Sequence, residues 1–326
     1  MYAAPVTRPS ARRRSNIPSP LSATIILAGL FAATLAAMVA NVAAVFAAGG
    51  DISRGNYLFH AAGCAGCHTD KKNKGAPLAG GRKLKTPFGV FYSPNITPDP
   101  DNGIGNWSDA DFIRALRLGI APDGQHYFPV FPYPSYTGIT DADLIDIKAY
   151  IFTRPPAPAP NKPHDVAAPF GWRFLLPIWK ALYFSPGPFR PEPGKSAASN
   201  RGRYLLRALG HCGECHTPRD ALGGAKDEMA MAGTDNAPGG GIVPNITPDK
   251  KTGIGRWSDA DLEELFKSGM LPDGDFVGSD MGEVVDLTTS RLSKSDIKAL
   301  IAALHALTPV DNKIEPKKKK KPKPDL

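Results

Sequence analysis

The chain carries one five-residue pattern twice, as CAGCH at residues 64–68 and as CGECH at residues 212–216. These two stretches hold all four cysteines of the 326-residue sequence. The cysteines of each pair are three residues apart, so on a helical turn both thiols lie on one side. The histidine that follows can turn its imidazole toward the same place. The pattern therefore predicts one chemical site built twice.

This is the pattern by which a c-type haem is attached to protein. The thiols form thioethers with the haem, and the histidine binds its iron. A four-cysteine zinc site would need the two pairs to converge, and a thioredoxin-like pair would need a βαβ context. Structural disulfides would not explain a histidine after each pair. The predicted residues are Cys64, Cys67 and His68 for one haem c, and Cys212, Cys215 and His216 for a second.

The segments that follow the two motifs also repeat. Matches of this length indicate a duplicated domain, and we take their offset of 150 residues to be constant. The matching stretches are PNITPD at 94–99 and 244–249, GIGxWSDAD at 103–111 and 253–261, and DIKA at 146–149 and 296–299.

Helix signals fall at equal places in the two copies. Ser108 and Ser258 are N-cap candidates, and Gly119 and Gly269 suit a left-handed C-terminal cap. Apolar residues between these caps follow the helical period. The loops are rich in Gly, Pro and Asn and show little strand alternation. Each copy is therefore expected to be helical.

A last helix is expected to start near Thr140 in the first copy and near Ser293 in the second. The predicted fold is all-α, with two tandem class I cytochrome c-like domains, a linker rich in proline and aromatic residues, and an N-terminal signal or anchor helix. The expected limits are 1–48 for the signal peptide or anchor, 49–153 for domain 1, 154–198 for the linker, 199–309 for domain 2, and 310–326 for a disordered lysine-rich tail.

The net charge of +8 comes from the chain ends. Four arginines lie in residues 1–48 and seven lysines in residues 313–326, while the rest is nearly balanced. A nucleic-acid-binding face is therefore not expected. The tail is expected to be solubilising, with attachment to anionic lipid or an acidic partner as the alternative.

Three arginines at 12–14 precede an apolar run from Leu21 to Ala48. A bilayer span takes about 20 residues, so the run is long enough for a membrane anchor. Val45-Phe46-Ala47 would also suit signal cleavage. Both possibilities export the chain, so we expect it on the periplasmic side of the bacterial inner membrane, either anchored there or released into the periplasm.

The linker contains an aromatic stretch from Phe170 to Phe184. We expect it to pack along or between the two domains. Docking to the membrane or to a partner subunit is the alternative.

The sixth iron ligand is expected to differ between the two haems. Met281 is the candidate for the second, in a Gly-rich loop before the last helix. The constant offset places Phe131 at its position in the first domain, which contains no methionine. His126 is the best substitute, and Tyr127, Tyr133, a ligand from elsewhere or an open site are the alternatives. The first haem should then have the lower reduction potential. The other methionines of the second domain are expected in packing or loops: Met229, Met231 and Met270.

The segment YFPVFPYPSY at 127–136, both PNITP stretches and the GIGxWS segments resemble the cytochrome c subunits of bacterial membrane-bound alcohol, gluconate and aldehyde dehydrogenases. The resemblance covers about residues 51–309. It implies that the protein accepts electrons from a catalytic subunit and passes them to quinone, another cytochrome or a terminal oxidase. In that family the loop commonly has Met where this chain has Phe131, and well-known members have three haems where this chain has two motifs.

Electron transfer without substrate chemistry is the leading hypothesis. One alternative is a dihaem enzyme, in which an open or weakly ligated first haem acts on peroxide or a sulfur compound. Another is a membrane-tethered assembly subunit with structural haems. Rapid binding of cyanide or carbon monoxide at the first haem would favour the enzyme.

Overall fold

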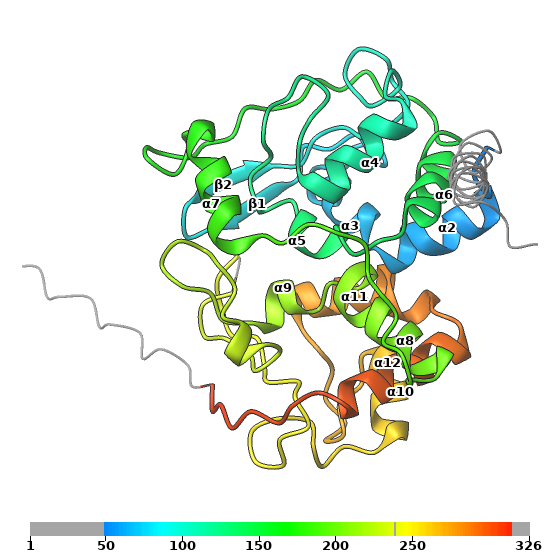
Figure 1. Ribbon diagram of the computed structural model, residues 1–326, viewed down its shortest axis with the longest axis vertical. Coiled ribbons are helices and arrows are strands. Elements are labelled where there is room, and N and C mark those ends of the chain that lie inside the picture. Colours follow the sequence, from blue (N-terminus) through cyan, green and yellow to red (C-terminus); the bar gives the residue numbers. More distant parts are fainter. Residues whose placement is uncertain (1–48, 238, 315–326) are drawn as a thin grey trace, which may run out of the picture. The chain divides into compact units, whose positions relative to one another are not determined.

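The computed structural model describes residues 49–237 and 239–314, and helices dominate it (Figure 1). The predicted anchor or signal at 1–48 and the lysine run of the tail lie outside the described residues. None of the described helices has the length and apolar character needed to cross a membrane. The first copy contains α2 (Ile52–Ala61), α3 (Cys64–His68), β1 (Lys83–Thr86), β2 (Gly89–Tyr92), α4 (Asp109–Leu118), α5 (Tyr133–Tyr136) and α6 (Asp141–Ile151); the linker contains α7 (Leu176–Tyr183); the second copy contains α8 (Ala197–Tyr204), α9 (Gly213–His216), α10 (Asp259–Ser268), α11 (Ser279–Leu287) and α12 (Lys294–His305).

Helices α4 and α10 begin and end where the sequence predicts. Ser108 forms a capping box with Asp111 at the start of α4, and Gly119 ends the helix with φ +61°. Helix α10 has the same features at Ser258, Asp261 and Gly269. These local signals were predictable because capping uses neighbours in the chain.

The first and last helices of each copy cross at a glycine. Helix α2 lies against α6, and α8 lies against α12 (Figure 1). A Cβ on Gly55 would fall 1.9 Å from the carbonyl oxygen of Asp146, and one on Gly202 would fall 1.9 Å from that of Ala299. Only glycine fits at these distances. Helix α3 begins three residues after α2, and the π-helix Leu205–Leu209 separates α8 from α9.

The offset between the copies is not constant, so that prediction is wrong. The third residue of α6, Asp143, donates its backbone N–H to the N-cap hydroxyl of Thr140. The third residue of α12, Asp296, donates in the same way to Ser293. Asp296 therefore corresponds to Asp143 and not to Asp146, because the loops before the two helices differ in length.

A small hairpin corrects the prediction of an all-α fold. Strand β1 pairs antiparallel with β2, with Lys83 opposite Tyr92 and Thr86 opposite Gly89. Strands of four residues are too short to give a clear alternation signal in the sequence. Val90 of β2 also bridges to the linker. The fold is mostly helical, with one two-stranded sheet among the described residues.

The linker packs against both copies, as predicted for its aromatic stretch. Leu176 of α7 is buried in a cluster with the hairpin. The Trp179 indole N–H donates to the carbonyl of Leu222, in the second copy, at 2.9 Å. Phe174 and Leu182 are 70% and 65% exposed, however. Docking of this exposed side stays a prediction.

The two copies share one hydrophobic cluster. It includes Leu58 and Ile147 of the first copy and Leu209 and Ile297 of the second, all at most 1% exposed. Residues 49–314 thus have a continuous core that runs through both copies. The predicted limits of the domains stay a prediction.

Candidate functional site

Both cysteine motifs lie on short helices. Helix α3 spans the first motif and begins after Gly63, which has φ +66°. Helix α9 covers the second motif from Gly213 to His216, with Cys212 as its N-cap. No disulfide joins any of the four cysteines in the described part of the chain. The predicted attachment residues and proximal histidines are therefore brought together, one set in each copy.

Burial suppresses ionisation of the leading thiol of each motif. Desolvation raises the pKa of Cys64 to about 12 and that of Cys212 to about 12. Reactive redox cysteines need the opposite, a lowered pKa. In the described part of the chain, no cluster of three or more metal-binding side chains is formed. The raised pKa of these two thiols is the opposite of what a thioredoxin-like pair needs.

The two histidines are held in the tautomer that a metal ligand needs. The Nδ1–H of His68 donates to the carbonyl oxygen of Pro94, and that of His216 to the carbonyl oxygen of Pro244, each at 2.8 Å. The Nε2 lone pair of each ring is then available to iron. Burial lowers the pKa of both imidazoles, which keeps them neutral. These residues fit a covalently attached haem in each copy.

The structure assigns a role to the repeated PNITP stretch. The amide oxygen of Asn95 accepts from the backbone N–H and the hydroxyl of Thr97, at 2.9 and 2.7 Å. Asn245 binds Thr247 in the same way. Both asparagines are at most 3% exposed. They shape the loop whose proline carbonyl holds the proximal histidine.

Sequence reasoning missed this role of Pro94 and Asn95. The signal was present, because the stretch occurs in both copies. It could not be interpreted from the sequence, since the histidine it serves lies 26 residues away.

Met281 is the third residue of α11 and does not lie in a loop as predicted. The Gly-rich segment before it ends at Gly278, which is the N-cap of this helix. Helix α11 packs against α10 of its own copy and also against α3. Ligation of iron by Met281 stays a prediction.

Phe131 lies in an aromatic cluster in the first copy. Its ring packs edge-on against Tyr127, Tyr133 and Tyr136, with centroids 5.5, 6.4 and 5.9 Å away. The Tyr136 hydroxyl donates to the carbonyl of Ala62, two residues before the first motif. The segment that resembles the dehydrogenase subunits therefore packs beside the attachment helix.

His126 lies where the linker covers the first copy. Its carbonyl accepts from Arg173 at 2.6 Å. Burial and the nearby Lys180 ammonium lower its pKa. Its Nδ1 is buried and has no hydrogen-bond partner in the described structure. A neutral imidazole with a free nitrogen is available here, and ligation by His126 stays a prediction.

Of the three remaining methionines, Met231 packs at the second motif as expected. It is 6% exposed, and its Cε lies 3.4 Å from the Cβ position of Gly213. Met229 ends a short 3-10 turn. Met270 follows α10 and is 37% exposed.

Comparisons with known proteins show which family the chain is similar to. The cytochrome c family model matches residues 52–154. A diheme cytochrome c-type protein of Cereibacter sphaeroides is 43% identical over 265 residues, which cover 80% of this chain and 88% of the relative. The fructose dehydrogenase cytochrome subunit of Gluconobacter japonicus is 40% identical, over 78% of this chain and 52% of the relative. The gluconate 2-dehydrogenase cytochrome c subunit of Pantoea cypripedii is 38% identical, over 78% and 59%.

The chain thus spans a little over half the length of these two dehydrogenase subunits, and nearly the whole of the diheme relative. The matched region includes the first attachment motif, its histidine and the Pro94 loop. With duplicated attachment helices and neutral, oriented imidazoles, the chain belongs to the cytochrome c family.

Proposed function

We propose that this protein transfers electrons through two covalently attached haems, as the cytochrome subunit serving a dehydrogenase. The observation that carries the proposal is the equal orientation of His68 and His216, each with Nδ1 bound to a proline carbonyl at 2.8 Å. The haem, when bound, supplies an iron that cycles between ferric and ferrous. The chain would hold it through the two thiols of each motif and keep the imidazole ligand in place.

The relatives support the choice of partner. Several are cytochrome subunits of dehydrogenases that act on fructose, alcohol or gluconate. By this likeness, a catalytic dehydrogenase subunit gives electrons to the protein, which passes them to the respiratory chain. We place this activity on the periplasmic side of the bacterial inner membrane, because residues 1–48 read as an export signal or anchor.

We propose different axial sets for the two haems, His216 with Met281 and His68 with His126. A His/Met set raises the reduction potential of iron. The haem in the first copy should therefore titrate at the lower potential. Burial keeps both proximal imidazoles neutral, so neither would lose its lone pair to a proton near pH 7.

The test is an optical redox titration of the exported holoprotein, after its mass has been measured. We expect two haem additions on the chain and two one-electron steps. Met281→Leu should remove the sulfur-to-iron charge-transfer band and lower the upper potential. His126→Ala should change only the lower step, because the two sites lie in different copies.

Met270→Leu and His305→Ala are the controls, and both should leave the titration unchanged. A mass with fewer than two haems would refute the proposed function. Normal haem content with an unaltered lower step in His126→Ala would remove only that residue from the ligand set.

A further inference from the structure

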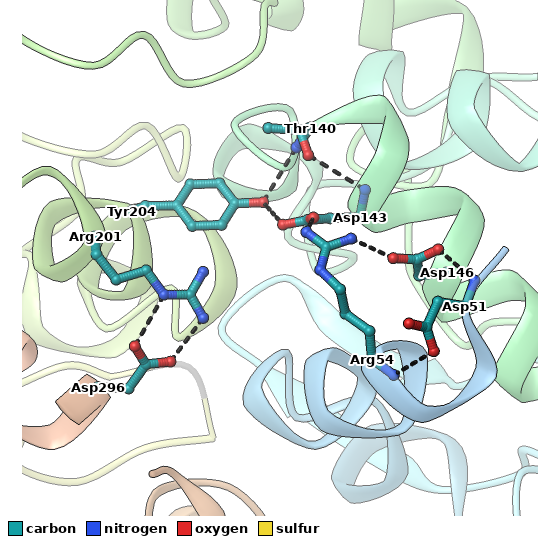
Figure 2. A network of polar contacts seen from close by, with 8 residues as sticks. All are labelled: Asp51, Arg54, Thr140, Asp143, Asp146, Arg201, Tyr204 and Asp296. Carbon is teal, nitrogen blue, oxygen red and sulfur yellow. Dashed lines mark hydrogen bonds and ion pairs between the residues drawn. The ribbon is translucent and has the colours of Figure 1, made fainter. Parts of the chain in front are cut away.

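Tyr204, at the end of α8 in the second copy, reaches into the first copy (Figure 2). Its hydroxyl donates to Asp143 Oδ2 at 2.6 Å and accepts from the backbone N–H of Thr140 at 3.1 Å. Thr140 is the N-cap of α6, and Asp143 lies one turn inside that helix. The tyrosine thus binds the start of the other copy's last helix.

Tyr57 of α2, in the first copy, makes the equivalent contacts with the second copy. Its hydroxyl donates to Asp296 Oδ2 at 2.6 Å and accepts from the backbone N–H of Ser293 at 3.2 Å. Ser293 is the N-cap of α12. Each copy gives one tyrosine and receives one, which is the pattern of an interface with two-fold symmetry.

Each aspartate is also fixed from its own side. Arg54 of α2 binds Asp143, and Arg201 of α8 binds Asp296 at 2.7 Å (Figure 2). Asp143 and Asp296 are 2% and 8% exposed. Because both carboxylates are buried, losing the tyrosine or the arginine would leave a carboxylate oxygen without its hydrogen bond.

The first attachment motif lies against the second copy. A Cβ placed on Gly66 would lie 3.6 Å from the Leu287 side chain of α11. Arg82 of the first copy binds both the Gly66 carbonyl and Glu283 of α11, the latter at 2.6 Å.

The second attachment motif lies against the first copy. The Ser135 hydroxyl of α5 donates to Glu214, inside the second motif, at 2.5 Å. Both attachment helices are therefore located at the boundary between the copies.

We propose that Tyr57 and Tyr204 are positioning residues for electron exchange between the two haems. By tying each copy to the aspartate of the other, they hold the two attachment motifs against opposite copies at a fixed separation. This inference rests on the proposed function, because it requires both haems. The rate of electron tunnelling falls steeply with separation, so a loosened boundary would slow the exchange.

The test compares the wild-type holoprotein with the double variant Tyr57→Phe and Tyr204→Phe. One haem is reduced by pulse radiolysis, and the re-equilibration between the haems is followed by absorbance. We expect the internal exchange to slow at least tenfold in the double variant, with both equilibrium potentials unchanged. We also expect the rate to become dependent on solvent viscosity, because motion of the copies would then limit it.

Tyr92→Phe is the matched control, since Tyr92 lies in β2 of the first copy, and it should leave the rate unchanged. If the double variant fails to retain its haems, the two single variants replace it, and symmetry predicts similar slowing in each. An unchanged, viscosity-independent rate with two haems present overturns this inference alone. A wild-type mass with one haem overturns the proposed function as well.

Discussion

At the residue scale, the chemistry depends on how a neutral imidazole is presented. His68 donates its Nδ1–H to Pro94, and the neighbouring Asn95 holds that loop through Thr97 and through the carbonyls of Ala157 and Ala159. The asparagine therefore links the proximal histidine to the start of the linker. It thereby helps to hold the loop whose proline carbonyl orients His68.

Asn95→Ala should lower the free energy of unfolding by at least about 2 kcal/mol, since several buried polar groups lose their partner at about 1–3 kcal/mol each. Denaturant titration of the holoprotein measures this change. Asn106→Ala is the control, because Asn106 is exposed, and it should change stability by less than about 0.5 kcal/mol. Equal effects of the two substitutions would contradict the role of Asn95.

Single residues were predictable only where the chemistry is local. The cysteines and histidines of the two motifs follow from their spacing, and the structure places them together on α3 and α9. Pro94 and Asn95 were not predictable in role, because their partners are distant in sequence. The helical position of Met281 was missed because Gly278 and Gly282 suggested a loop.

At the scale of elements, each copy depends on one helix crossing. Gly55 in α2 and Gly202 in α8 allow the last helix to approach so closely that a carbonyl oxygen occupies the place of a Cβ. The attachment helices come a few residues later. Any separation of a crossing would therefore displace the motif that follows it.

Gly202→Ala should destabilise the protein by about 3 kcal/mol or more, because the new methyl would overlap the carbonyl of Ala299 and force α8 from α12. Thermal or chemical unfolding of the holoprotein reports this loss. Gly278→Ala serves as the control, because no atom lies within 4 Å of a Cβ placed on Gly278. A stability close to wild type in Gly202→Ala would show that the crossing is looser than described.

At this scale the helix caps were predictable from the sequence, but the residue-by-residue alignment of α6 with α12 was not. Ser108 and Ser258 cap as expected, since both partners of each capping box lie within four residues. The DIKA match paired Asp146 of α6 with Asp296 of α12, although Asp143 is the equivalent residue. A short identical stretch does not show how far along its helix each residue lies. The backbone contacts of Gly55 and Gly202 give the correct alignment.

At the scale of the whole molecule, the boundary between the copies contains two buried carboxylates. For Asp296, burial alone would raise the pKa. The hydrogen bonds from Arg201 and Tyr57, together with the charge of Arg201, lower the pKa by more than burial raises it. The net pKa is below that of the unfolded chain, which is about 3.9. This carboxylate thus stabilises the fold above that pH, and its contribution is lost as the pH falls through the native pKa.

The free energy of unfolding should therefore decrease as the pH falls from 5 to 3. Denaturant titrations at both values should show a smaller decrease for Asp296→Asn than for the wild type. Other carboxylates with lowered pKa, such as Asp220, keep part of the dependence in the variant. A pH dependence identical in the two proteins would mean that Asp296 titrates alike in the folded and unfolded states.

The duplication was predictable from sequence, but the way in which the copies meet was not. PNITP and GIGxWSDAD mark the repeat without showing which side of each copy is covered. Tyr57 and Tyr204 carry no local signal, since each binds a helix far away in the chain. The shared core across the boundary likewise depends on contacts that span most of the sequence.

The exchanged tyrosines have a consequence for ancestry. A half-length chain with the Tyr, Arg and Asp of either copy would complement itself, so two such chains would assemble as a symmetric homodimer whose formation depends on concentration. Fusing the two genes makes the pairing unimolecular and fixes its stoichiometry at any expression level. It also allows each half to change independently. The bridge between Ile120 and His126 in the first copy corresponds to the bridge between Met270 and Phe276 in the second, so the two halves carry different residues at the same place.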